Sequence, residues 1–233
     1  MYNTQDIYEQ LKKKYDNQEF RIVNGQKTIE IQGAHFIADK PYIVREPNYE
    51  YFHRELEWYD SQSLFVEDIP HDDEHPIPKI WKTVSDDSGK INSNYGWCVY
   101  SDENYNQYQY CLNKLVEDNF TREAVMIYNR PSMVKEAFES NMRDFMCTFA
   151  IQCFLNYIED ENIFKLNYHV YMRSNDAVFG FNNDILWHRV VQERLVDDLN
   201  EKLDTTVIAG DVVWTAGSLH VYERHFKYLE NNN

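Results

Sequence analysis

The sequence is poor in the residues that break or cross-link a polypeptide chain. Its 233 residues include only 7 Gly, 6 Pro and 4 Cys. Without a Gly/Ser linker or an internal repeat, residues 1–233 are expected to form a single catalytic domain. The cysteines show neither metal-binding spacing nor a dense disulfide framework, which favours a reduced, cytoplasmic compartment. They are Cys98, Cys111, Cys147 and Cys153.

Long apolar runs and positive charge are also scarce. No stretch reaches the 18 apolar residues that a membrane span needs, and the polar N-terminus lacks a signal-peptide pattern. Lys and Arg number 23 against 39 Asp and Glu, so the formal net charge is −16. Such a surface repels phosphate backbones and anionic lipids, so neither nucleic-acid polymers nor membranes are expected as partners. Aromatic residues make up 15% of the chain, a content that excludes disorder.

Apolar periodicity predicts an α+β domain, because helices and strands mix without regular β-α-β alternation. A helix is expected to begin near Thr4, and the segment from Glu67 to Pro78 reads as an exposed loop. The best helical pattern runs from Asp184 to Leu203. Strands are expected at Thr28–Phe36, Thr148–Ile158, Ile163–Met172, Val207–Ile208, Val212–Thr215 and Leu219–Tyr222, the second and third forming a hairpin.

Three local features could carry chemistry. Cys147 precedes an apolar strand, and Arg173-Ser174 offers a fork of donors with a hydroxyl, which suits a phosphate monoester. The loop from Phe179 to Asp184 leads into the long helix. Taken singly, these features equally suit a buried structural cysteine, a salt-bridged turn and a helix cap.

Taken together and in order, the motifs resemble the thymidylate synthase family, specifically its phage deoxycytidylate hydroxymethylase branch. The resemblance covers Tyr95 to Tyr222, with further matches upstream. The matching segments are Arg54-Glu55-Leu56-Glu57-Trp58, Ile80-Trp81, Tyr95-Gly96, Met146-Cys147 with Gln152, Arg173-Ser174-Asn175-Asp176, Phe179 to Asp184, and Gly217-Ser218-Leu219-His220-Val221-Tyr222.

The resemblance implies a thymidylate synthase fold: a large mixed sheet flanked by helices, with one sheet face packing at a homodimer interface. It also implies a one-carbon transferase that takes 5,10-methylenetetrahydrofolate as co-substrate and uses no metal. Its ligands would be a nucleotide monophosphate and a folate.

Residue roles also follow from the resemblance. Cys147 would be the nucleophile, and Glu55 and Tyr95 would manage protons and the reacting water. The phosphate would be bound by Arg173, Ser174, the partner subunit's Arg122 and Arg21, and the deoxyribose by His220 and Tyr222. Asp184 would read the pyrimidine, and Gln152 would be a further substrate-binding residue. The folate would be bound by Asp176 and Trp81. Arg173 would also favour the thiolate of Cys147.

Departures from the family pattern point to the substrate. Where thymidylate synthases read the pyrimidine with Asn, this chain has Asp184. A carboxylate accepts from the 4-amino group of cytosine and can share a proton with N3, so dCMP is favoured over dUMP. Thr148 stands where the family has His, Met172 replaces a Gln, and Glu123 replaces the second of two arginines.

The end of the sequence, Lys227 to Asn233, lacks the apolar segment with which the family closes over folate. We therefore expect the reaction to end with water, giving 5-hydroxymethyl-dCMP, in the host cytoplasm if the chain is of phage origin. A dUMP-using thymidylate synthase or deoxyuridylate hydroxymethylase remains an alternative. A non-enzymatic acidic DNA mimic, motivated by the net charge, is an alternative of another class.

Overall fold

One mixed eight-stranded sheet organises the molecule, whose computed structural model describes residues 1–230. Positions 231–233, the end of the C-terminal segment considered above, lie outside the described residues. The strand order is β1-β3-β8-β6-β5-β4, with β2 paired to β3 and β7 paired to β8. The strands are β1 (Tyr2–Asn3), β2 (Arg21–Val23), β3 (Gln26–Ile37), β4 (Val125–Ile127), β5 (Thr148–Ile158), β6 (Ile163–Met172), β7 (Asn175–Asp176) and β8 (Val207–Tyr222).

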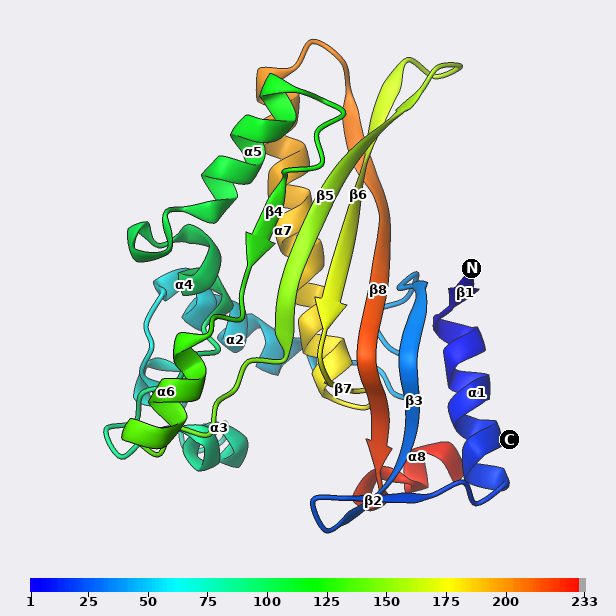
Figure 1. Cartoon of the computed structure of the whole chain (residues 1–233), viewed down its shortest axis with the longest axis vertical. Helices are drawn as coiled ribbons and strands as arrows, with labels where there is room; N and C mark the ends of the chain where they lie inside the picture. Colours follow the sequence, from blue (N-terminus) through cyan, green and yellow to red (C-terminus); the bar gives the residue numbers. More distant parts are fainter. Residues whose placement is uncertain (231–233) are drawn as a thin grey trace.

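Helices gather mainly beside this sheet, and Figure 1 shows α4, α5 and α7 to one side of it with α1 beside β3. The helices are α1 (Thr4–Asp16), α2 (Tyr49–Ser61), α3 (Lys79–Val84), α4 (Tyr95–Tyr100), α5 (Gln107–Glu117), α6 (Ser132–Glu139), α7 (Gly180–Lys202) and α8 (Lys227–Glu230). Short 3-10 turns are η1 (Val66–Asp68), η2 (Asp102–Asn104) and η3 (Glu223–His225). The predicted α+β class is confirmed.

The sheet has one fully buried face and one half-buried face. Along β6, the side chains of Leu166, Tyr168 and Val170 are completely buried, whereas those of the alternating residues Asn167 and His169 are only partly covered. This period of two is what a strand with one face in the core requires. The helix α7 packs on the core face, and its own buried stripe includes Val191, Leu195 and Leu199.

The predicted first helix, hairpin and long helix are all present. The helix α1 begins at Thr4, where the Asn3 and Asp6 side chains each accept from the other residue's backbone N–H, forming a capping box. The hairpin strands β5 and β6 have the predicted bounds. The helix α7 begins at Gly180, four positions before the predicted start. The crossover through α7 lets β6 and β8 pair in parallel, while β5 and β6 pair antiparallel.

The prediction of three short strands after α7 was wrong, because β8 is a single strand of 16 residues. Gly210 and Gly217 lie between the three predicted strands, and both allow a neighbouring backbone or side chain to approach closely. A Cβ on Gly210 would lie 2.2 Å from Asn167 Oδ1, and one on Gly217 would lie 2.9 Å from the backbone oxygen of Arg173. These glycines therefore serve close packing in the sheet.

The segment predicted as an exposed loop, Glu67 to Pro78, is largely exposed and irregular after η1. Ile69 and Ile77 anchor it in the core. Across residues 1–230, no helix combines the length and apolar character that crossing a membrane requires.

Candidate active site

A cavity of about 680 Å³ opens where β6 and β8 end and β5 begins. Ten of the predicted site residues line it although they come from separate stretches of the chain. They are Glu55, Trp81, Tyr95, Cys147, Arg173, Ser174, Asp176, Asp184, His220 and Tyr222. The fold therefore brings together most of the residues that the motifs singled out.

Local structure explains how these side chains reach the cavity. The helix α2 presents Glu55, and α4 presents Tyr95 from a turn whose N-terminus is capped by Asn94. The short strand β7 pairs with β8 in parallel, with Asp176 opposite His220, so that both arrive at the same end of the sheet. Asp184 lies in the first turns of α7.

Cys147 is a free thiol at the start of β5 and lines the cavity. Burial raises the pKa of the Cys147 thiol to about 11, while the Arg173 guanidinium acts in the opposite direction. Arg173 donates to the backbone oxygen of Met146 at 3.1 Å and also to that of Phe145. These contacts fix the guanidinium in the cavity, where its charge favours the thiolate less strongly than burial opposes it.

Glu55 is a buried carboxyl group held by a short hydrogen-bond series. Trp81 Nε1 donates to the Tyr51 hydroxyl at 2.9 Å, and Tyr51 donates to Glu55 Oε1 at 2.7 Å. Burial, together with the nearby Asp184 carboxylate, raises the pKa of Glu55 to about 8. A carboxyl group with this pKa can both release and accept a proton near neutral pH.

Asp184 has a hydrogen-bond donor on each carboxylate oxygen. Tyr95 donates to Oδ1 at 3.1 Å, and the side-chain amide of Asn175 donates to Oδ2 at 2.7 Å. Burial raises the pKa of Asp184 to about 7, against the effect of these two donors. With this pKa, both the acid and the carboxylate form of Asp184 are accessible near neutral pH.

The folate candidate Asp176 and the ribose candidates His220 and Tyr222 line the same cavity. Burial raises the pKa of Asp176 to about 6, although the backbone N–H of Val178 donates to it at 2.9 Å. His225 Nδ1 lies 3.9 Å from Asp176 Oδ2. Burial lowers the pKa of His220, whose ring packs edge-on against Tyr222 at 4.7 Å. A lowered pKa favours the uncharged imidazole of His220, which can donate one hydrogen bond and accept another.

Three predicted residues do not line this cavity. Arg21 Nη1 donates to Glu30 Oε2 at 2.5 Å, and the Arg21 side chain is 55% exposed. Gln152 Nε2 donates to the backbone oxygen of Arg122 at 2.9 Å. Gln152 also lies opposite His169, on the half-buried face of the sheet. Within one chain, the structure therefore does not bring Arg21, Arg122 or Gln152 to the cavity.

Several lining residues had no recognisable signal in the sequence. Arg45, Arg143 and Arg224 line the cavity together with Arg173. Arg45 lies 4.7 Å from the centre of the Phe179 ring, and Arg224 lies 4.2 Å from that of Tyr222. Because they come from loops and turns outside any motif, only the folded structure identifies them.

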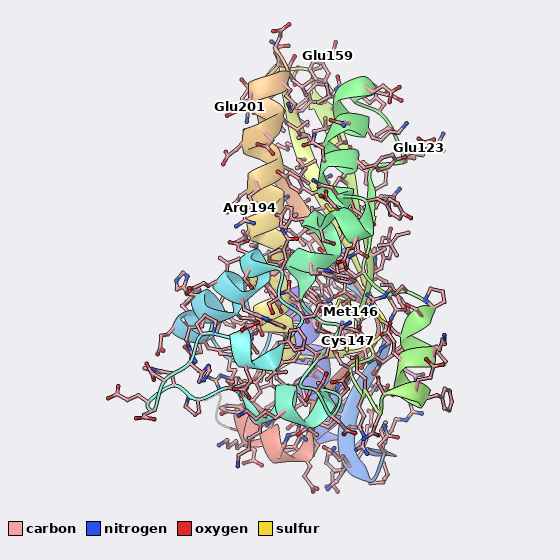
Figure 2. All side chains as sticks on the ribbon, turned by 90° about the vertical axis from the view of Figure 1, so that its left-hand side faces the viewer. Glu123, Met146, Cys147, Glu159, Arg194 and Glu201 are labelled. Carbon is pink, nitrogen blue, oxygen red and sulfur yellow. The ribbon has the colours of Figure 1, made fainter. Side chains whose placement is uncertain are left out.

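Negative charge is spread over the rest of the molecule. Figure 2 shows Cys147 in the lower half, whereas Glu159 and Glu201 are near the opposite end and Glu123 lies to one side. The described residues include no cluster of three or more His, Cys, Asp or Glu side chains placed to hold a metal ion. The cavity thus gathers arginines inside a protein of strongly negative total charge.

Comparisons with known proteins agree with this geometry. A family model described as thymidylate synthase matches residues 5–232. Deoxycytidylate 5-hydroxymethyltransferases of Enterobacteria phages T4 and T2 are each 49% identical to the chain over 208 residues, covering 89% of the chain and 80% of the relative. The solved structure of thermostable thymidylate synthase A from Bacillus subtilis aligns with a TM-score of 0.67 at 19% identity, covering 97% of this chain and 84% of that one.

Proposed function

The chain belongs to the thymidylate synthase family, and from this premise we propose that it is a deoxycytidylate 5-hydroxymethyltransferase. It transfers the one-carbon unit of 5,10-methylenetetrahydrofolate to C5 of dCMP and releases 5-hydroxymethyl-dCMP. The 49% identity to the phage T4 deoxycytidylate 5-hydroxymethyltransferase supports this assignment over other activities of the family.

The observation that carries the choice of base is the position and protonation of Asp184. Its carboxyl group lines the cavity that also contains Cys147, and it has a pKa of about 7. As a carboxylate it accepts from the 4-amino group of cytosine, and as an acid it gives a proton to N3. Uracil presents the opposite pattern, an oxygen at C4 and a proton on N3, so it lacks the 4-amino donor and the basic N3 that Asp184 reads.

The first chemical step is the addition of the Cys147 thiolate to C6 of the pyrimidine. The bond from sulfur to C6 forms, and C5 gains the electron density needed to attack the methylene carbon of the folate. Burial raises the pKa of this thiol, so the step includes release of the thiol proton to solvent before sulfur attacks. The proton that Asp184 shares with N3 balances the charge that develops on the ring.

The second stage removes the C5 proton and expels tetrahydrofolate, leaving an exocyclic methylene group on the ring. Glu55, with its pKa of about 8, accepts and returns protons in this stage and orients the incoming water. Water adds to the methylene carbon, the bond from Cys147 to C6 breaks, and the thiolate is restored. No net oxidation or reduction occurs.

Binding of the two anionic ligands is assigned to the remaining lining residues. Arg173 and Ser174 bind the phosphate, His220 and Tyr222 bind the deoxyribose hydroxyl, and Asp176 with Trp81 binds the folate. A bidentate guanidinium suits a phosphate monoester, and the arginines that line the cavity favour anions despite the net charge.

The enzyme is further proposed to act as a homodimer that buries the half-buried sheet face. Arg122 and Gln152 are joined to each other and lie away from the cavity of their own chain. Gln152 lies on the half-buried face, where Phe149 of β5 and Ile127 of β4 are also well exposed. A second subunit packed on this face would bury these side chains and bring Arg122 to its partner's phosphate site.

The direct test is incubation with 5,10-methylenetetrahydrofolate and either dCMP or dUMP, followed by mass spectrometry of the nucleotide. We expect dCMP to gain one CH₂O unit and tritium to be released from C5 of labelled dCMP. The Cys147→Ser variant should show neither, because the sulfur nucleophile is absent. Turnover of dUMP without turnover of dCMP would refute the proposed substrate.

A further inference from the structure

Two departures from the family pattern lie in contact behind Asp184. Thr148 and Met172 are direct partners across the β5–β6 pair, and both are buried. The Thr148 hydroxyl lies 2.8 Å from the Tyr95 hydroxyl and 3.2 Å from Met172 Sδ. Tyr95 in turn lies 3.1 Å from Asp184 Oδ1. Four side chains therefore form one continuous series that ends at the carboxyl group.

When Asp184 is ionised, the series has only one consistent direction. A carboxylate can only accept, so Tyr95 donates its single hydroxyl proton to Asp184. The oxygen of Tyr95 is then free to accept, and Thr148 donates to it. In this arrangement the thioether sulfur of Met172 accepts no hydrogen bond.

When Asp184 carries a proton toward Tyr95, every hydrogen bond must turn around. Asp184 then donates to Tyr95, Tyr95 donates to Thr148, and the Thr148 proton needs a new acceptor. Met172 Sδ, at 3.2 Å, is an acceptor that has no proton of its own. An amide at position 172 could both donate and accept a hydrogen bond, whereas a thioether can only accept one from Thr148.

We propose that Thr148, Tyr95 and Met172 form a hydrogen-bond chain that reverses direction when Asp184 gains or loses its proton, which makes Thr148 a positioning residue for recognition of a 4-aminopyrimidine. The proposal rests on the proposed function, because a cytosine ring requires both states of Asp184. The proton passes from Asp184 to N3 as sulfur adds to C6, and returns when sulfur leaves.

The surroundings explain why Asp184 has both states available. Glu55 on α2 and Asp176 on β7 are acidic groups that face it, and Cys147 at the start of β5 is a third group that would repel its charge. Asn175 donates to the oxygen that Tyr95 does not contact. The reversible chain lies on Oδ1, so the amide contact is the same in both states.

The hydrogen-bond chain can be tested in the free enzyme, without any substrate. We would follow the Asp184 carboxyl carbon by ¹³C NMR during a pH titration, with Asp184→Asn to assign the signal. Met172→Leu removes the acceptor that only the neutral state uses, so it should lower the pKa of Asp184 by roughly half a unit. Met126→Leu, at a buried methionine away from the cavity, should leave it unchanged.

A double variant separates this mechanism from a general effect of the smaller side chain. In a Thr148→Val background the hydroxyl that contacts Met172 is missing, so adding Met172→Leu should produce no additional change in the pKa of Asp184. If the pKa of Asp184 is unchanged in the Met172→Leu single variant, the proposed hydrogen-bond chain is refuted. It is also refuted if Met172→Leu changes this pKa equally in the wild-type and Thr148→Val backgrounds.

The positioning role of Thr148 is tested by comparing the two nucleotides. Thr148→Val keeps the shape but loses the hydroxyl, and should reduce kcat/KM for dCMP about tenfold with little change for dUMP. Thr148→Ser retains the hydroxyl and should restore the wild-type ratio. Equal losses on both nucleotides would show a merely structural role. A wild-type enzyme inactive on dCMP would instead refute the proposed function, while the Asp184 titration would still test the chain.

Discussion

Three carboxyl groups, one buried and two partly buried, share the cavity, and each has a different proton affinity. Burial raises the pKa of Asp176 to about 6, that of Asp184 to about 7 and that of Glu55 to about 8. In solution all three would be ionised at neutral pH. The cavity therefore holds protons that an open cleft would lose, and a pyrimidine whose ring must gain and lose a proton can use them.

This proton affinity has a consequence for stability, which we expect to fall as the pH rises from about 4.5 to about 8. Below this window Glu55 is neutral in both the folded and the unfolded protein. Within it, the unfolded chain ionises while the folded carboxyl remains neutral, so unfolding is increasingly favoured. Glu55→Gln should raise the free energy of unfolding at pH 8 by roughly 3–5 kcal/mol and change it little at pH 4.

Denaturant unfolding of both proteins at the two pH values measures this difference. Glu57→Gln, at an exposed position on the same helix, is the matched control and should behave as the wild type. An equal effect of Glu55→Gln at pH 4 and pH 8 would contradict a raised pKa in the folded state.

The base preference should depend on the single side chain at position 184. In Asp184→Asn the amide can donate to the C4 oxygen of uracil and accept from its N3–H, so we expect the ratio of kcat/KM for dCMP over dUMP to fall by at least about tenfold. Competition between the two nucleotides in one reaction measures the ratio directly. A preference that stays the same would remove Asp184 from base recognition.

Among single residues, the sequence predicted those that lie in motifs occurring in a recognisable order, because residue type and spacing can both be read from the sequence. Glu55, Cys147 and Asp184 were found in this way and line one cavity. Tyr51 and Asn175 were not assigned roles, although they hold Glu55 and Asp184. Their contribution depends on which side chain meets which across separate elements, and a linear pattern carries no such information.

At the level of helices and strands, apolar periodicity predicted the bounds of those elements that are set by the local sequence. The hairpin bounds agreed because β6 alternates along its whole length, β5 alternates over its middle part, and a polar turn separates them. The strand β8 was predicted as three short strands, whereas it is continuous, and Gly210 and Gly217 within it accommodate neighbouring atoms of the sheet. That constraint comes from neighbours in the sheet, so it is absent from the local sequence.

The contact between α2 and α4 should tolerate no additional atom. A Cβ on Gly96 would lie 1.9 Å from the backbone oxygen of Tyr59. Gly96→Ala must therefore move α4 away from α2, with an expected loss of about 3 kcal/mol in the free energy of unfolding. Because Tyr95 and Glu55 lie on these helices, turnover should fall as well.

Thermal or denaturant unfolding, together with the dCMP assay, measures both effects. Cys98→Ala, which removes one buried atom from the same helix, is the matched control and should cost only about 1 kcal/mol. If Gly96→Ala were as stable as the wild type, the helices could not be as closely packed as described.

For the molecule as a whole, total charge does not describe the composition of the site. The chain carries a net charge of −16, yet four arginines line the cavity beside five acidic side chains. Total charge reflects the excess of Asp and Glu over the whole chain. It carried no information about the site, because Arg45, Arg143 and Arg224 converge only after folding.

Assembly should be visible in the activity of mixed subunits. If Arg122 serves the partner's site, Arg122→Ala and Cys147→Ser are each inactive alone, but their heterodimer contains one intact site. Random exchange of equal amounts should restore about a quarter of the wild-type activity, since half of the dimers are mixed and each has one working site of two. Activity that does not recover after confirmed subunit exchange would place Arg122 outside the site.

The series from Trp81 through Tyr51 to Glu55 also gives the protein an optical property. An indole whose N–H is hydrogen-bonded at 2.9 Å to a hydroxyl, and whose ring lies 5.5 Å from that of Trp58, emits light according to its immediate surroundings. A bound pterin beside Trp81, or a change in the charge of Glu55 two side chains away, alters those surroundings. If Trp81 contacts the folate as proposed, we expect the intrinsic fluorescence of the protein to change when the folate binds, without any added label.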